Sequence, residues 1–193
     1  MEGPSDAGVP GRSAAAKALD LARLLHGECA RLLDLFRERE SFPADHDPEG
    51  GRLVSLGRWS DDMSAAEQVW HHRCALRKCL GLLELLIARE EEEEMGGGDE
   101  GEYEAVRRAV RERLGHLLFS TAALLDDGDD VGDLSPQHDC AEGRDEVEGS
   151  GSFAMKLWMY KVLLELIHWT GSTSKVLCEL HSEREAKQEQ TDL

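Results

Sequence analysis

The chain has 193 residues, of which 40% are hydrophobic, 32% charged and only 5% aromatic. This length is enough for one well-buried core, and the composition favours a soluble helical protein over a sheet protein. With 22 Lys and Arg against 40 Asp and Glu, the formal net charge is -18. A field of that sign repels phosphate, so we expect no nucleic-acid partner and no attraction to an anionic membrane.

The N-terminal residues, the cysteines and the most apolar segment indicate the cellular compartment of the protein. Residues 1–12 hold two of the five prolines and three glycines and are predicted to be a flexible tail. They lack a basic region followed by an apolar run, so we expect no secretory signal. Cys74 and Cys79 lie about 7.5 Å apart along a predicted helix, beyond the ~7 Å limit for a bridge. We therefore expect reduced cysteines and a cytoplasmic protein. The most apolar segment, residues 79–88, is too short and too interrupted for membrane insertion.

Apolar residues recur at spacings of three and four in four segments, which predicts four helices. Ser13 is a predicted N-cap, and Ser64 with Glu67 forms a capping box. No segment alternates as a strand would. The predicted helices span residues 13–40, 64–92, 102–126 and 153–182 of one domain, 13–184, followed by a polar tail, 185–193. The last helix carries one stripe at residues 153, 157, 160, 164 and 167 and a second at 158, 162, 166 and 169.

The connections between these helices differ in length. More than 20 residues join the first helix to the second and the third to the fourth, whereas fewer than ten join the second to the third. Two long links around a short one favour an all-α, long-chain up-up-down-down four-helix bundle with two long crossover loops. The long links are also compatible with insertions in an up-down bundle. The acidic runs 90–94, at the short link, and 126–148, in the second long link, are interpreted as solvated loops, with a partner epitope as the alternative.

Two sets of side chains resemble metal ligands. His71, His72, Cys74 and Cys79 point to different sides of one helix, so four ligands do not converge. A single Glu-x-x-His on the last helix lacks the second copy that a di-iron bundle needs. Phosphate-binding glycine motifs and a nucleophile elbow are absent. We therefore expect no enzyme activity, no metal and no cofactor.

Phe153 and Lys156 share one face of the first turn of the last helix. In one interpretation Phe153 folds back as a hydrophobic staple and Lys156 is an ordinary surface residue. In the other, an exposed aromatic ring beside a cation forms a hot spot for a partner protein. The spacing alone favours the first interpretation and leaves the second open as the alternative.

The last helix carries a resemblance to a known family. Its residues 153–158, FAMKLW, continued by Lys161-Val162-Leu163 and Trp169-Thr170, resemble the last helix of the ciliary neurotrophic factor family. This family belongs to the interleukin-6 group of long-chain four-helix cytokines. Trp59-Ser60 and the leucine-rich run that ends at residue 89 resemble the region of its second helix. The first and third helices match only in pattern.

The resemblance implies a neurotrophic growth factor that bridges cell-surface receptors, acting as a monomer or weak dimer. Phe153 and Lys156 would bind the leukaemia inhibitory factor receptor. The exposed faces of the first and third helices would bind the shared glycoprotein signal transducer. Trp59 would help to bind the ciliary neurotrophic factor receptor alpha. The ciliary neurotrophic factor family also lacks a signal peptide, whereas most of its relatives are secreted conventionally, and this implies release from the cytoplasm by a non-classical route.

One residue departs from the family's pattern. Ser172 stands where a basic residue is expected, next to Gly171, which leaves binding to the alpha receptor in question. A cardiotrophin-like cytokine that needs no alpha receptor is therefore one alternative. An intracellular helical adaptor is the other.

Overall fold

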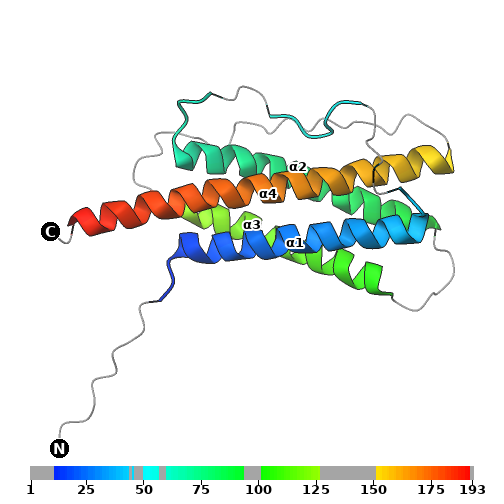
Figure 1. Cartoon of the computed structure of the whole chain (residues 1–193), viewed down its shortest axis with the longest axis horizontal. Helices are drawn as coiled ribbons and strands as arrows, with labels where there is room; N and C mark the ends of the chain where they lie inside the picture. Colours follow the sequence, from blue (N-terminus) through cyan, green and yellow to red (C-terminus); the bar gives the residue numbers. More distant parts are fainter. Residues whose placement is uncertain are drawn as a thin grey trace, which may run out of the picture.

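The computed structural model describes residues 11–43, 45, 50–56, 60–93, 101–126 and 151–191. These residues form four helices and no strand: α1 (Ala14–Glu40), α2 (Ala65–Glu93), α3 (Glu102–Asp126) and α4 (Ser152–Thr191). The helices lie lengthwise beside one another (Figure 1). The all-helical fold with four helices is thus confirmed for the described part of the chain. None of the described helices has the length and apolarity needed to cross a bilayer.

The capping interactions predicted at the starts of α1 and α2 are present. Ser13 accepts a hydrogen bond from Ala16 N through its hydroxyl, which caps α1. Ser64 N donates to the Glu67 carboxylate at 2.7 Å, and Glu67 N donates back to the Ser64 hydroxyl at 3.2 Å. This reciprocal pair is the capping box expected from the sequence.

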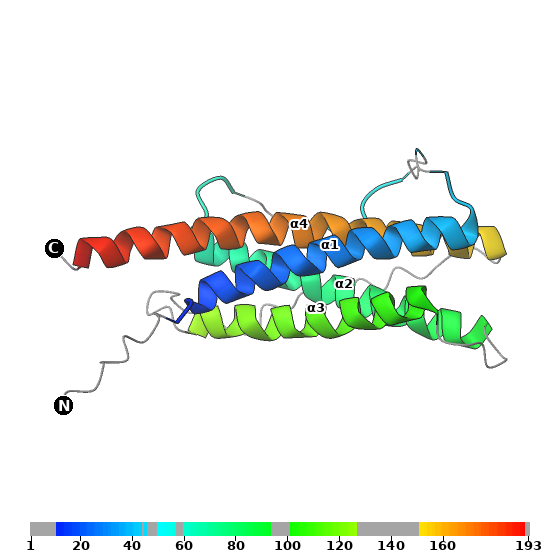
Figure 2. The same cartoon turned by 60° about the horizontal axis from the view of Figure 1, so that its bottom comes forward.

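The end of α4 differs from the prediction. The helix continues to Thr191, where a polar tail was expected from residue 185, and Figure 2 shows this end projecting beyond the other helices. No Gly or Pro interrupts residues 182–191, which are rich in Glu, Arg, Ala, Lys and Gln, all strong helix formers. His181 Nε2 also lies 3.4 Å from the Glu185 carboxylate one turn later.

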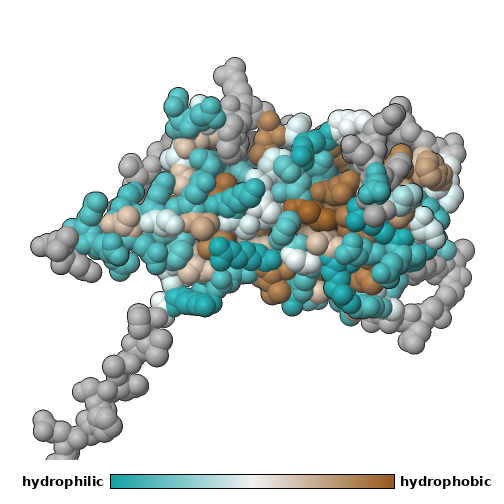
Figure 3. Space-filling model, viewed as in Figure 1, coloured by the Kyte–Doolittle hydropathy of each residue, from teal (hydrophilic) through white to brown (hydrophobic). Residues whose placement is uncertain are grey.

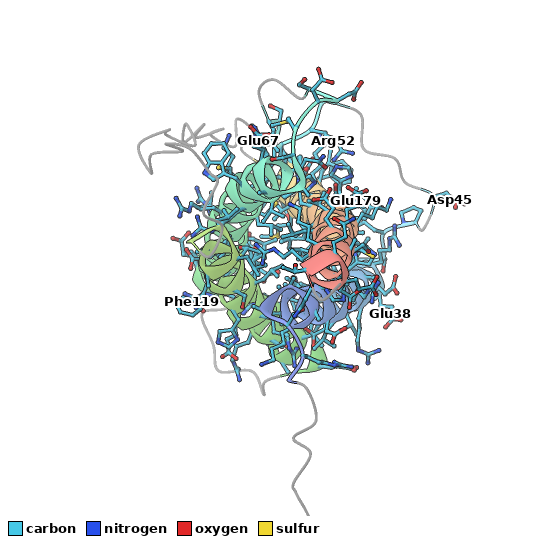
Figure 4. All side chains as sticks on the ribbon, turned by 90° about the vertical axis from the view of Figure 1, so that its left-hand side faces the viewer. Glu38, Asp45, Arg52, Glu67, Phe119 and Glu179 are labelled. Atoms are coloured by element: carbon cyan, nitrogen blue, oxygen red, sulfur yellow. The ribbon has the colours of Figure 1, made fainter. Side chains whose placement is uncertain are left out.

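Each helix packs against two of the others. Close contacts join α4 to α1 and α2, and join α3 to α1 and α2, whereas no Cα atoms of α1 and α2 approach within 8 Å. Figure 4, which looks along the bundle, shows the helices arranged around a shared core. Every helix contributes fully buried leucines to that core, among them Leu25, Leu76, Leu114 and Leu163.

Contacts between α1 and α4 join the start of one helix to the end of the other. Ser13 at the start of α1 lies 3.5 Å from His181 near the end of α4, and Glu40 at the end of α1 pairs with Lys156 at the start of α4. α1 and α4 therefore run antiparallel.

The two stripes predicted on α4 are buried unequally. The second stripe, Trp158, Val162, Leu166 and Trp169, is at most 8% exposed. In the first stripe only Tyr160 is buried, and Phe153 is 68% exposed. α4 packs against α1 and α2 on the face that carries the second stripe, which leaves the first stripe at the rim.

Candidate functional site

An exposed aromatic ring marks the start of α4. The Phe153 side chain stacks on Phe42 with 6.4 Å between ring centroids and 11° between planes. Phe42 stacks in turn on the buried Tyr160 at 5.3 Å and 7°. Phe153 thus packs on the Phe42 ring and is otherwise open to solvent, and its role as a hot spot for a partner stays a prediction. In Figure 3 hydrophobic surface is most extensive over the half of the molecule where α4 begins.

The turn after α1 places Phe42 in this stack. α1 ends at Glu40, and Ser41 adopts a left-handed conformation with φ 56. In this turn Phe42 N donates a hydrogen bond to the Arg37 carbonyl oxygen at 3.0 Å. The centroids of the Phe42 and Phe36 rings lie 5.8 Å apart. Arg37 also donates to the Tyr160 hydroxyl at 2.9 Å. The stack is therefore built from two segments far apart in sequence.

Lys156 lies one turn after Phe153 and is held by a carboxylate. Its Nζ is 2.5 Å from Glu40 Oε2, and its side chain is 39% exposed against 15% for Glu40. Burial works against the charge of Glu40, but the hydrogen bond from Lys156 and the charge of Arg39 lower the pKa of Glu40 below its usual value. Lys156 is thus an oriented cation at the rim of the bundle.

A buried charge cluster lies beneath this rim. Glu90 is only 4% exposed and accepts hydrogen bonds from Arg39 at 2.7 Å and from the Tyr103 hydroxyl at 2.8 Å, and it also pairs with Arg107. Burial and the Glu90 charge together raise the pKa of Tyr103.

The expectation that the 90–94 run is a solvated loop is therefore wrong for Glu90, because α2 continues to Glu93 and turns this carboxylate inward. Residue 94 lies outside the described residues.

Two large apolar side chains of α1 and α3 are also exposed. Leu24 on α1 is 51% exposed and Phe119 on α3 is 78% exposed. Figure 4 shows Phe119 pointing away from the bundle. Sequence reasoning missed both, although a signal was present: Phe119 falls outside the apolar stripe of its helix, which predicts a residue off the core face.

Two positions bear on binding to an alpha receptor. Trp59 lies outside the described residues, whereas Ser172 is described and makes a hydrogen bond. Its hydroxyl is 2.7 Å from Nε2 of His72, a side chain that is 1% exposed. His72 Nδ1 lies 2.7 Å from the Gln68 carbonyl oxygen. Because a carbonyl only accepts, Nδ1 carries the proton and Nε2 accepts from Ser172. Ser172 thus faces α2 and supports a neutral buried imidazole.

Gly171, next to Ser172, makes room for a second histidine. A Cβ atom at Gly171 would lie 3.0 Å from Cε1 of His26. His26 Nδ1 lies 3.1 Å from the Ile167 carbonyl oxygen and 3.2 Å from the Thr170 hydroxyl. The glycine therefore permits close packing of α1 on α4 rather than only loosening the helix.

Glu165 and His168, the Glu-x-x-His pair of α4, both contact the segment 50–56. Glu165 accepts from Leu53 N at 3.1 Å and from Trp169 Nε1 at 3.0 Å, and it pairs with Arg52 at 3.6 Å. It therefore fastens the segment 50–56 to α4. His168, three residues on, lies 3.1 Å from Arg52. Among the described residues, no group of three or more potential ligands comes together.

The cysteines differ from the expectation of reduced thiols. Cys74 is disulfide-bonded, while Cys29, Cys79 and Cys178 are free. Burial raises the pKa of Cys29 to about 12, so this thiol is inert at neutral pH. The axial spacing that argued against a bridge applies to Cys74 and Cys79 alone. The expectation was wrong for Cys74 because spacing within one helix says nothing about partners elsewhere in the chain.

Comparison with known proteins does not identify the chain. No protein-family model matches it, and no curated protein sequence matches it.

Proposed function

We propose that this protein is a receptor-bridging cytokine that resembles ciliary neurotrophic factor. It binds the leukaemia inhibitory factor receptor through Phe153 and Lys156 and the shared signal transducer through the exposed faces of α1 and α3. Bringing these two receptors together activates the kinases bound to their cytoplasmic tails. A rigid bundle suits this task because it sets the distance between the receptors.

The observation that carries the proposal is the start of α4. An aromatic side chain that is 68% exposed stands on a stack of two further rings, with an oriented ammonium group one turn away. Exposed aromatic anchors next to a cation are typical of protein–protein hot spots, because they gain much buried area with little loss of conformational freedom.

We further propose the up-up-down-down topology with two long crossover loops. The antiparallel contacts of α1 with α4 support it, as do those of α2 with α3, where Arg73 donates to the Leu118 carbonyl at one end and Glu90 meets Tyr103 at the other. The colour gradient of Figure 1 runs in one direction along α1 and α2 and in the other along α3 and α4. The residues that would form most of the crossovers, 127–150 above all, lie outside the described residues.

The second receptor surface would use Leu24 and Phe119. Both are apolar and exposed, and both belong to the pair of helices, α1 and α3, that pack against each other. A surface phenylalanine that is 78% exposed gains most from burial in a complex.

The disulfide at Cys74 favours an extracellular ligand over an intracellular adaptor. Disulfides persist in oxidising compartments and are rare in the cytosol, where thiols are kept reduced. We therefore propose release from the cell, with the bridge formed outside the cytosol.

A cardiotrophin-like cytokine that needs no alpha receptor is the second candidate, and Ser172 favours it. The Ser172 hydroxyl is committed to His72 and carries no charge that could engage a receptor. Binding of the purified protein to the alpha-receptor ectodomain separates the two candidates.

The test of the main proposal is a pull-down of the three receptor ectodomains with purified protein, followed by receptor phosphorylation in responsive cells. We expect Phe153→Ala with Lys156→Ala to keep the fold and to abolish binding to the leukaemia inhibitory factor receptor. Lys187→Ala, near the far end of α4, is the matched control and should bind normally. An unchanged cell response from the double variant would rule out the assignment.

A further inference from the structure

The charged side chains near the start of α4 form a connected network that reaches all four helices. Lys156 on α4 pairs with Glu40 on α1 at 2.5 Å, and Arg39 Nε lies 3.1 Å from the other oxygen of Glu40. Arg39 Nη2 lies 2.7 Å from Glu90 on α2, and Glu90 pairs with Arg107 on α3. The exposed end of this chain of contacts is the ammonium group of Lys156.

The buried end of the network is fixed. Glu90 is 4% exposed and is satisfied by two guanidinium groups and the Tyr103 hydroxyl. A carboxylate with three such donors has no better position available, because moving it would leave buried charges without partners.

Arg39 connects the buried Glu90 to Glu40 nearer the surface. Its guanidinium group lies 4.0 Å from the centroid of the Tyr103 ring, in addition to its contacts with Glu90 and Glu40. The planar guanidinium is held by contacts on several sides, so its Nε presents a fixed donor to Glu40.

Glu40 and Lys156 differ in how open they are. The carboxylate is 15% exposed and lies on the inner side of the pair, whereas the ammonium side chain is 39% exposed. A lysine on a flexible stem ordinarily loses rotamer freedom when it binds a partner. A lysine already held by a fixed carboxylate has lost part of that freedom beforehand, and its three donors leave hydrogen-bonding capacity for a second acceptor.

We propose that Glu40 is a positioning residue that fixes the ammonium group of Lys156 for the receptor, itself held by Arg39 and, through Arg39, by Glu90. This inference rests on the proposed function of Phe153 and Lys156. The receptor surface that fits presents a carboxylate to Lys156 beside an apolar pocket for Phe153.

A double-mutant cycle tests this positioning role, with affinity for the ectodomain of the leukaemia inhibitory factor receptor as the readout. We expect Lys156→Ala to weaken binding about tenfold or more and Glu40→Gln to weaken it about three- to tenfold. In the Lys156→Ala background, Glu40→Gln should change affinity less than about twofold, because no ammonium group remains to be positioned.

Two further variants separate contact from charge. Glu40→Asp keeps the charge but shortens the side chain by one methylene group, which moves the carboxylate away from Lys156. We expect it also to weaken binding. Glu38→Gln removes an exposed carboxylate of α1 that Figure 4 shows pointing outward, and we expect it to bind as the unaltered protein does. The unfolding midpoint of each variant is measured alongside, so that a general loss of structure is recognised.

The outcomes distinguish the inference from the proposed function. If Lys156→Ala binds normally, the proposed function fails. If Lys156→Ala weakens binding but Glu40→Gln has the same effect with and without Lys156, Glu40 is only structural and the inference fails. Tighter binding by Glu40→Gln would mean that Glu40 competes with the receptor, and normal binding by Glu40→Asp would mean that charge at a distance suffices; either result overturns the positioning role.

Discussion

The ring of Phe42 lies almost parallel to the ring of Tyr160, with 5.3 Å between centroids and 7° between planes. Tyr160 is 1% exposed and belongs to the core of α4, whereas Phe42 belongs to the turn after α1. Phe42 thus connects the rigid interior to the exposed Phe153 ring, which also stacks on it.

Phe42 and Phe153 should therefore contribute unequally to stability. We expect Phe42→Ala to lower the free energy of unfolding by about 2 kcal/mol, since it removes a partly buried ring that stacks on two others. Phe153→Ala should lower it by less than about 0.5 kcal/mol, because that side chain is mostly in solvent. Denaturant unfolding followed by circular dichroism measures both. Equal effects of the two variants would mean that Phe153 belongs to the core.

Gly171 gives a second prediction. Alanine is favoured over glycine in a helix interior by about 1 kcal/mol, but here its Cβ would lie 3.0 Å from His26, which is anchored to Ile167 and Thr170. We expect Gly171→Ala to destabilise the protein by about 1 kcal/mol, since the lost His26 contacts outweigh the helix propensity.

Gly81 on α2 is the matched control for this substitution. No atom lies within 4 Å of a Cβ at that position. We expect Gly81→Ala to raise the free energy of unfolding by about 0.5–1 kcal/mol. Stabilisation by both alanines would contradict the close packing inferred at His26.

His72 predicts how stability depends on pH. Burial lowers the pKa of His72 below its ordinary value of about 6.5. The unfolded chain therefore binds a proton at a higher pH than the folded chain does, so stability is complete above about pH 6.5 and falls as the pH decreases further. Denaturant unfolding at a series of pH values from 7.5 to 5 measures this loss.

The substitution His72→Gln isolates this contribution. Glutamine does not titrate, so the variant should lose less stability between these pH values than the unaltered protein. Its stability at pH 7.5 should already be lower by about 1–3 kcal/mol, because a buried hydrogen-bonded group has been replaced. An undiminished pH dependence would assign the effect to other groups, such as His71 and His168, whose pKa values are also lowered by burial.

Glu90 and Glu84 lie on the same helix and should differ sharply when neutralised. Glu90→Gln leaves the buried Arg107 without its charge partner, and we expect a loss of about 3 kcal/mol in the free energy of unfolding. Glu84 pairs with Arg111 at 3.2 Å with both side chains about half exposed, so Glu84→Gln should change stability by less than about 0.5 kcal/mol. Thermal unfolding of the two variants provides the comparison.

The local features of the fold could be predicted from the sequence. The cap at Ser13 and the capping box of Ser64 and Glu67 depend on residues within one turn of each other, and both are formed as expected. The shared position of Phe153 and Lys156 on the first turn of α4 likewise follows from helical geometry alone.

The sequence by itself determined four helices, their starts and the candidate residues at the beginning of α4. The tertiary structure decided which apolar residues remain in solvent, placed Glu90 in the interior and gave Gly171 its role beside His26. The physical reason is the distance of the interacting partners along the chain. Caps and stripes depend on neighbours a few residues away, whereas burial and ion pairing depend on side chains from other helices that only packing brings together.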